Sequence, residues 1–466
     1  MVGIVSYGSY IPSYRLPRDV IAKEWDSPSL GGERALASFD EDSLTLAVNA
    51  SIDALGDRNP KDVAGIFFAS TTPPYREKQA AATVATVLDT DKELRTMDFT
   101  DSLRAATSAL LTALDLAKAG ELLVVCAGDS RMGEPDTLQE QNYGDAGGAV
   151  VVGTENVIAE LVGTYTISQE FLGTWRTEEQ DYLKSFPGGF ENKFGYNRFI
   201  AATVQGVLKN CNLEEKDITN AAIAAPTHKA LKSALRSQGF DIKTQVQETF
   251  WNTIGDAGTA QPLVLLAAVL ERAKPGDLLL VAGYGDGGDA AVFRATDGIA
   301  NFQVARSVYS QIEVKRTLES YGKYARFRKL IRKDYSTDDE STPVVLMRDQ
   351  KQILPLYGGR CPECGVIQFP IHRICTECGQ RDGLEEVKLS RRGTLFTFTH
   401  DYLTDTPDPP TTHAVIDLDG GGRLFVQLTD CQAEGVEIGM PLELTFRKYH
   451  EGYGIKNYFW KARPAQ

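Results

Sequence analysis

The sequence has no long apolar run and no excess of basic residues. None of its hydrophobic stretches reaches the ~20 residues that a transmembrane helix needs. Its 63 Asp and Glu residues outnumber its 49 Lys and Arg residues, which gives a formal net charge of −14. Because nucleic-acid backbones attract basic surfaces, this balance argues against a general nucleic-acid-binding protein. We therefore expect a protein that neither spans a membrane nor binds nucleic acid.

Cysteine is also scarce, with seven in 466 residues, an odd number that argues against a disulfide framework. Four of the seven lie in two close pairs, a spacing typical of metal ligands in a reducing compartment. We therefore expect a cytoplasmic protein. The chain is too long for one ordinary hydrophobic core, so two or three domains are expected.

The first part of the chain contains an internal repeat. AKAGELLVVCAGD (117–129) and AKPGDLLLVAGYGD (273–286) each follow an apolar helical stretch and combine a Gly turn with a buried strand. This pattern predicts a duplicated α/β unit over residues 1–305, with halves at about 1–155 and 156–305. Continuously apolar strands of this kind are typical of sheets that helices cover on both faces.

The character of the sequence changes after residue 305. The segment VKRTLESYGKYARFRKLIRK (314–333) has a helical pattern and eight Lys or Arg residues. It fits either a solvated helix face or a docking surface for an anion such as a CoA phosphate. Residues 334–343 are acidic and polar, so we interpret 306–343 as a basic helical segment followed by a linker.

Cys361, Cys364, Cys375 and Cys378 form the pattern C-x2-C-x10-C-x2-C. Two such pairs supply the four thiolates of a tetrahedral zinc site, which predicts a zinc ribbon over residues 344–388; a metal-free ribbon is the alternative. Four protein ligands leave no open coordination position, so the predicted zinc is structural.

The last part of the chain consists of short segments in which apolar and polar residues alternate, separated by turns rich in Gly, Asp and Pro. This pattern predicts a small antiparallel β-barrel over residues 389–466. The expected strands are 393–400, 413–418, 422–428, 442–449 and 456–462.

Several segments resemble 3-hydroxy-3-methylglutaryl-CoA synthase of the thiolase superfamily. They are GIVSYGSYIPSYRL (3–16), ASTTPPYREKQAAATVATVL (69–88), GDAGGAVVVG (144–153), WNTIGDAGTAQPLVLLAAVLERAKPGD (251–277) and ESYGKYARFRKLI (319–331). The last ~120 residues look like the zinc-ribbon and OB-fold family that accompanies acyl-CoA enzymes, whose OB fold implies no nucleic-acid binding. The resemblance implies a thiolase-like duplicated α/β sandwich of five layers, a pantetheine tunnel for an acyl-CoA thioester, a homodimer, and a complex with a thiolase-type enzyme.

The chain departs from this family at the nucleophile. Family members use a cysteine thiolate to take the acyl group from CoA. Matching Ala105, Ala106 and Thr107 to the family pattern places Leu103 at that position, and leucine forms no acyl-enzyme. The neighbouring Ser102 is also a candidate catalytic residue, although one helical residue rotates a side chain by about 100° and a serine needs a base to activate it.

The resemblance implies that two other family residues are replaced in this sequence and that one is retained. Thr71 and Thr72 stand where the resemblance places the general-acid glutamate, and Ala224 stands where it places the histidine, with His228 nearby. Asn252 matches the family asparagine that hydrogen-bonds the thioester region; a turn asparagine is the alternative interpretation.

Three functions remain open. The first is an acyl-CoA-binding subunit that works with a thiolase-type partner. The second is a non-covalent aldol or retro-aldol lyase acting on a β-hydroxyacyl-CoA, for which the candidate polar residues are Asp101, Tyr143, Asp256 and Tyr284, although Asp101 also fits a helix cap. The third is the ordinary condensation of acetyl-CoA with acetoacetyl-CoA, which requires that the placement of Leu103 be wrong.

Overall fold

The computed structural model describes residues 1–186, 189–236, 238–331 and 342–465. The chain forms two compact units. The first comprises Met1–Ser38 and Asp42–Tyr321, and the second comprises Phe39–Glu41 and Gly322–Gln466.

The first unit is built on a nine-stranded sheet with the order β11-β12-β13-β8-β1-β7-β6-β4-β5. Its strands are β1 (Gly3–Tyr10), β4 (Val63–Ala69), β5 (Arg95–Phe99), β6 (Leu122–Asp129), β7 (Ala146–Gly153), β8 (Ala159–Ser168), β11 (Asn220–Ile223), β12 (Leu278–Tyr284) and β13 (Gly287–Ala295).

The sheet confirms the predicted duplication. The order β4-β6-β7-β1 in the first half is repeated as β11-β12-β13-β8 in the second, with one parallel pair followed by antiparallel ones. An isolated parallel bridge between Ala221 and Val246 stands where β5 pairs with β4 in the first half. The repeated sequence segments are the strands β6 and β12, and the halves join through a short pairing of β1 with β8.

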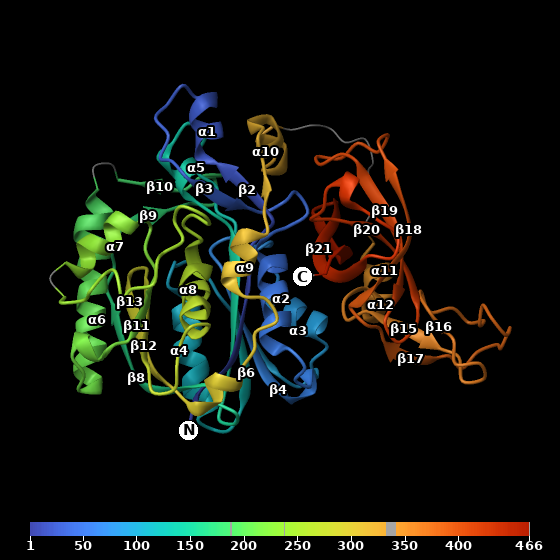
Figure 1. Ribbon diagram of the computed structural model, residues 1–466, viewed down its shortest axis with the longest axis horizontal. Coiled ribbons are helices and arrows are strands. Elements are labelled where there is room, and N and C mark those ends of the chain that lie inside the picture. Colours follow the sequence, from blue (N-terminus) through green and yellow to red (C-terminus); the bar gives the residue numbers. More distant parts are fainter. Residues whose placement is uncertain (187–188, 237, 332–341, 466) are drawn as a thin grey trace. The chain divides into compact units, whose positions relative to one another are not determined.

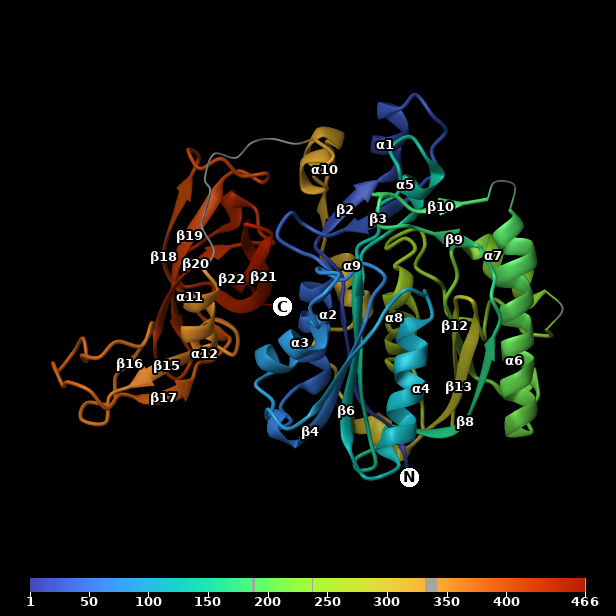
Figure 2. The same cartoon turned by 180° about the vertical axis from the view of Figure 1, so that it is seen from behind.

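Helices cover both sides of each half, as the continuously apolar strands predict. The central layer contains α4 (Ala105–Ala117) and α8 (Gln261–Leu270), which contact strands of both halves and each other. One outer layer contains α2 (Ser43–Leu55) and α3 (Ala80–Leu88), and the other contains α6 (Asn197–Cys211) and α7 (His228–Leu235). Figures 1 and 2 show these layers on either side of α4 and α8, which gives the five-layered thiolase-like sandwich.

Smaller elements complete the first unit. They are β2 (Tyr14–Pro17), β3 (Glu33–Leu36), β9 (Thr174–Trp175), β10 (Lys184–Ser185), β14 (Arg316–Thr317), α1 (Arg18–Glu24), α5 (Leu138–Asn142), α9 (Val308–Glu313), a π-helical turn (Glu191–Tyr196) and 3-10 turns at Pro60–Asp62, Glu215–Asp217, Gly258–Ala260 and Asp297–Asn301.

The segment after residue 305 corrects two expectations. It belongs to the first unit as far as Tyr321, because α9 contacts α8 and β14 pairs with β2. The predicted basic helix over 314–333 is mostly absent from the described residues, since this pairing draws Arg316 and Thr317 into a strand and only α10 (Tyr321–Phe327) is helical. Residues 334–341 of the predicted linker and the last two residues of the predicted helix, 332–333, lie outside the described residues.

The second unit contains the ribbon and the barrel. Its ribbon region is formed by α11 (Pro343–Arg348), α12 (Gln350–Ile353), β15 (Tyr357–Arg360), β16 (Ile367–Gln368) and β17 (Glu385–Lys388). A closed barrel follows in the order β18-β19-β20-β22-β21. Its strands are β18 (Arg392–Asp401), β19 (Thr411–Leu418), β20 (Arg423–Leu428), β21 (Pro441–Gly452) and β22 (Ile455–Pro464), with a 3-10 turn at Ala433–Gly435.

The barrel prediction is confirmed, with one difference in strand direction. Four of the five strand pairings are antiparallel, but β20 and β22 are parallel, with Leu428 opposite Ala462. Strand β20 alternates as predicted, with Leu424 and Val426 buried and Phe425 exposed. The alternation of apolar and polar residues within one strand does not determine the direction of the neighbouring strand. The sequence pattern therefore did not predict the parallel pairing of β20 with β22.

None of the helices in the described part of the chain combines the length and the apolar character needed to cross a bilayer.

The central position of α8 predicts a large effect of a cavity-creating substitution. Leu266 is fully buried in α8, so Leu266→Ala is expected to lower the free energy of unfolding by about 2–5 kcal/mol. The matched control is Leu172→Ala, because Leu172 is 51% exposed. Urea unfolding of the full chain, followed by tryptophan fluorescence, measures both variants. Equal effects of the two substitutions would contradict the central placement of α8.

Candidate functional site

A cavity of about 580 Å³ lies in the first unit where both halves contribute loops after their parallel strands. Carboxyl ends of parallel strands are the usual place for sites in α/β folds. Arg131 follows β6, Tyr284 ends β12, and Leu103 lies between β5 and α4. Its lining includes Leu103, Arg131, Tyr143, Glu191, Asp256 and Tyr284.

Leu103 lines this cavity with a half-buried side chain, just before α4 begins at Ala105. None of the described residues that line the cavity is a cysteine. Cys126 is buried inside β6, where burial raises the pKa of its thiol to about 12. This thiol is therefore neither at the cavity nor ionised near neutral pH.

A buried ion pair joins the two halves at the cavity wall. Arg131 Nη2 lies 2.6 Å from Asp256 Oδ1, and both side chains are almost completely buried. The Arg131 guanidinium also lies 4.2 Å from the centroid of the Tyr143 ring. Burial raises the pKa of Tyr143 to about 12. Tyr143 and Asp256 are further held by a parallel backbone bridge, and Gly144 N–H donates to the Asp256 carbonyl at 3.0 Å.

Position 258, next to the ion pair of Arg131 and Asp256, requires glycine. Gly258 has φ +57°, and a Cβ there would lie 2.7 Å from Arg131 Nε and 2.5 Å from Asp129 Oδ2. The chain therefore passes close to the guanidinium only because residue 258 has no side chain.

Glu191 is the first residue of the π-helical turn and is a half-buried member of the cavity wall. The Thr174 hydroxyl donates to Glu191 Oε1 at 3.0 Å. Burial raises the pKa of the Glu191 carboxyl above its usual 4.5. Sequence reasoning missed both Glu191 and Arg131, because neither lies in a recognisable motif.

Three tyrosines, Tyr143, Tyr196 and Tyr284, also line the cavity. Tyr284, a predicted candidate, is buried at the end of β12 and lines the cavity. Its pKa lies well above the usual 10, chiefly because of burial. Tyr196 Oη donates to the Ala224 carbonyl at 2.9 Å, and both residues also line the cavity.

Three other predicted residues lie outside the cavity lining. Asp101 is exposed, with φ +69°, and does not cap α4, whose N-cap is Arg104. Ser102 Oγ donates to Asp286 Oδ2 at 3.3 Å. Asn252 is exposed, and its backbone carbonyl accepts a hydrogen bond from Glu33 N–H at 2.9 Å.

The residues at the positions matched to the general acid and the histidine of the family lie in different environments. The hydroxyls of Thr71 and Thr72 donate to buried Asp129 at 2.9 and 3.0 Å. Ala224 lines the cavity, as does His228, which is exposed at the first position of α7.

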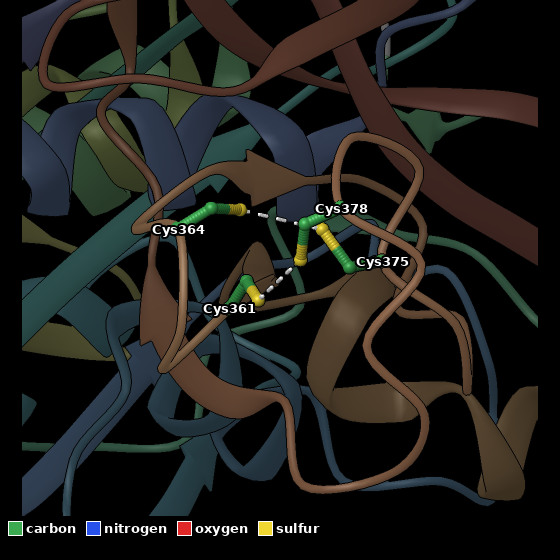
Figure 3. A group of neighbouring side chains, drawn as sticks. All are labelled: Cys361, Cys364, Cys375 and Cys378. Atoms are coloured by element: carbon green, nitrogen blue, oxygen red, sulfur yellow. Dashed lines mark hydrogen bonds between the residues drawn. The ribbon is translucent and has the colours of Figure 1, made fainter.

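The four predicted metal ligands converge in the ribbon (Figure 3). The Sγ atoms of Cys361 and Cys378 lie 3.6 Å apart, as do those of Cys364 and Cys375, and all four lie within 4.8 Å of one another. A tetrahedral site with Zn–S bonds of about 2.3 Å requires sulfur atoms about 3.8 Å apart. The cluster therefore has the size and donor set for one zinc ion.

Comparison with known proteins agrees with this architecture. Hydroxymethylglutaryl-CoA synthase of Methanopyrus kandleri is 31% identical over 345 residues, which cover 71% of this chain and 98% of the synthase. The Archaeoglobus fulgidus synthase is 30% identical, with coverage of 71% and 100%. A crystal structure of HMG-CoA synthase complexed with CoA shares the fold, with a TM-score of 0.63, 18% identity, and coverage of 73% and 92%.

The second unit has a separate match. A family model for the C-terminal OB-fold domain of ChsH2 matches residues 386–447, which lie mostly in the closed barrel. The duplicated five-layered fold and the identity over almost the full length of these synthases lead to one conclusion. The chain belongs to the hydroxymethylglutaryl-CoA synthase family of the thiolase superfamily and carries an additional OB-fold domain.

Proposed function

We propose that the chain binds a CoA thioester in the cavity and takes part in carbon–carbon bond formation or cleavage without a covalent acyl intermediate of its own. The observation that carries this proposal is Leu103, an aliphatic residue in the cavity wall at the position matched to the family nucleophile. A related synthase fold has been solved with CoA bound, which supports a CoA thioester as the ligand.

In the first form of this proposal, a thiolase-type enzyme supplies the missing nucleophile. The matched OB-fold domain supports this form, because the resemblance of the ribbon and barrel is to partners of acyl-CoA enzymes. The chain would form a homodimer, hold the thioester and present it to the cysteine of the partner enzyme.

In the second form, the chain itself is an aldol or retro-aldol lyase for a β-hydroxyacyl-CoA. Such a reaction needs an acid/base group and hydrogen-bond donors to the thioester oxygen, but no thiol. Glu191 and the hydroxyl of Tyr284 in the cavity favour this form. The alternative is the ordinary synthase activity, and detection of an acyl-enzyme intermediate would favour it.

Acylation tests the role of Leu103. After incubation with acetyl-CoA, we expect no acetyl adduct on the wild-type chain, because none of the described cavity-lining residues offers a thiol. Leu103→Cys is expected to gain one adduct, since its thiol would stand in the cavity wall. Intact mass spectrometry measures both, and Leu172→Cys, an exposed position, serves as the control. An adduct on the wild-type chain would refute the non-covalent proposal.

The cysteine cluster is proposed to hold one structural zinc ion through Cys361, Cys364, Cys375 and Cys378. When bound, zinc would stabilise the ribbon without activating water, because all four positions are filled by protein. Metal analysis of the full chain is expected to give one zinc per chain. Cys361→Ser should lower this ratio, whereas Cys431→Ser, outside the cluster, should not. If the wild-type chain contained no metal, and added zinc did not change its thermal stability, the proposed site would be refuted.

Isolation from the native host distinguishes the two forms of the function. Under the partner form, the chain should elute together with a thiolase-type enzyme that carries an active cysteine. Under the lyase form, the purified chain alone should cleave β-hydroxyacyl-CoA esters. A chain that elutes alone and leaves such esters intact would contradict both forms.

A further inference from the structure

Glu191 differs from Asp256, the other carboxylate in the cavity lining, because no guanidinium of the described residues forms an ion pair with it. Asp256 is paired with Arg131 at 2.6 Å. Among the described residues, the hydrogen bond from Thr174 to Oε1 is the one polar contact of the Glu191 carboxylate. Its second oxygen is therefore available to a ligand in the cavity.

The surroundings hold this side chain in one place. Gly173 leaves the space that it occupies, since a Cβ at that position would lie 3.0 Å from Glu191 Cγ. The Thr174 hydrogen bond fixes the carboxylate end. Glu191 also begins a π-helical turn, a distortion that is frequent at functional sites.

From these contacts we propose that Glu191 is the proton-transfer residue for the carbon–carbon bond chemistry of the cavity. This inference rests on the proposed binding of a CoA thioester there. It assigns a role to a residue that the family pattern in this sequence does not mark.

The electrostatic surroundings suit this role. Burial raises the pKa of Glu191, the Thr174 hydrogen bond lowers it, Asp256 and Asp286 raise it, and Arg131 lowers it, with a net increase above 4.5. A carboxyl group with a raised pKa both accepts and returns a proton more readily near neutral pH.

The neighbouring groups have different chemistry. Burial, with the nearby Glu191 carboxylate among the further causes, raises the pKa values of Tyr143 and Tyr284, so their hydroxyls stay protonated near neutral pH. His228 is exposed at the cavity edge. This leaves Glu191 as the base and the hydroxyl of Tyr284 as a donor to the thioester oxygen.

The step balances without a further reagent. In retro-aldol cleavage, the Glu191 carboxylate takes the proton of the β-hydroxyl, the β-carbon forms its carbonyl and the Cα–Cβ bond breaks. The electron pair of that bond forms the thioester enolate, and Glu191 returns its proton to the α-carbon. The products are a carbonyl compound and a shorter acyl-CoA, and the reverse sequence is an aldol addition.

The reverse direction begins with removal of an α-proton, which needs no second substrate. We therefore expect the full-length chain to exchange the acetyl protons of acetyl-CoA in D₂O, followed by proton NMR. Glu191→Gln should slow this exchange about 100-fold or more, the usual size of general-base effects. The wild-type rate should rise with pH through a midpoint above 4.5 as the carboxyl ionises, and Glu191→Gln should lose this dependence.

Two controls separate chemistry from structure. Glu179→Gln, on the exposed part of the same segment, should leave exchange unchanged, and Glu191→Asp should retain part of it. Calorimetry should give the same acetyl-CoA affinity for the wild-type chain and Glu191→Gln. Binding without exchange by the wild-type chain, or full exchange by Glu191→Gln, would overturn the role of Glu191 and leave the proposed function standing. Failure of the wild-type chain to bind acetyl-CoA would instead refute the proposed function.

Discussion

The buried pair of Arg131 and Asp256 is the interaction on which the cavity depends. It joins the loop after β6 to the loop before α8, and so connects the two halves of the duplicated fold at one wall. Removing one partner would leave the other as an unpaired buried charge, which is strongly destabilising. The bridge between Tyr143 and Asp256 and the close approach at Gly258 tie the backbone to the same pair.

Under the proposed function, this arrangement would let a synthase-like fold carry out a chemistry without a covalent acyl intermediate. The duplicated halves still bring their strand ends together around a cavity, so the space for a thioester is a property of the fold. The reactive groups are a property of a few loop positions. In our proposal, Leu103 leaves the wall without a nucleophile, Glu191 transfers the proton, and the tyrosine hydroxyls donate hydrogen bonds.

Local patterns predicted most of the fold. The repeated segments contain the strands β6 and β12, and the five alternating segments form the barrel. The two cysteine pairs lie together in one compact cluster. Each of these signals is contained in a short stretch of sequence. The helix over 314–333 was wrong because pairing of β14 with distant β2 overrode local propensity.

The site was less predictable than the fold. Tyr143, Asp256 and Tyr284 were predicted as polar residues near the site that the family resemblance implies, and all three line the cavity. Glu191 and Arg131 were missed because their roles come from contacts between distant segments. Asp101, in contrast, lies close to Leu103 in sequence but is exposed. Its backbone has a positive φ, which the sequence pattern did not predict.

The most direct test of the account is a crystal structure of the chain with acetyl-CoA bound. If the chain binds acetyl-CoA without forming an acyl-enzyme, the structure should show an intact thioester in the cavity, with its acetyl group beside Leu103 and within reach of Glu191 and the Tyr284 hydroxyl. An acetyl group covalently attached to a side chain, or a thioester bound elsewhere on the chain, would contradict the account.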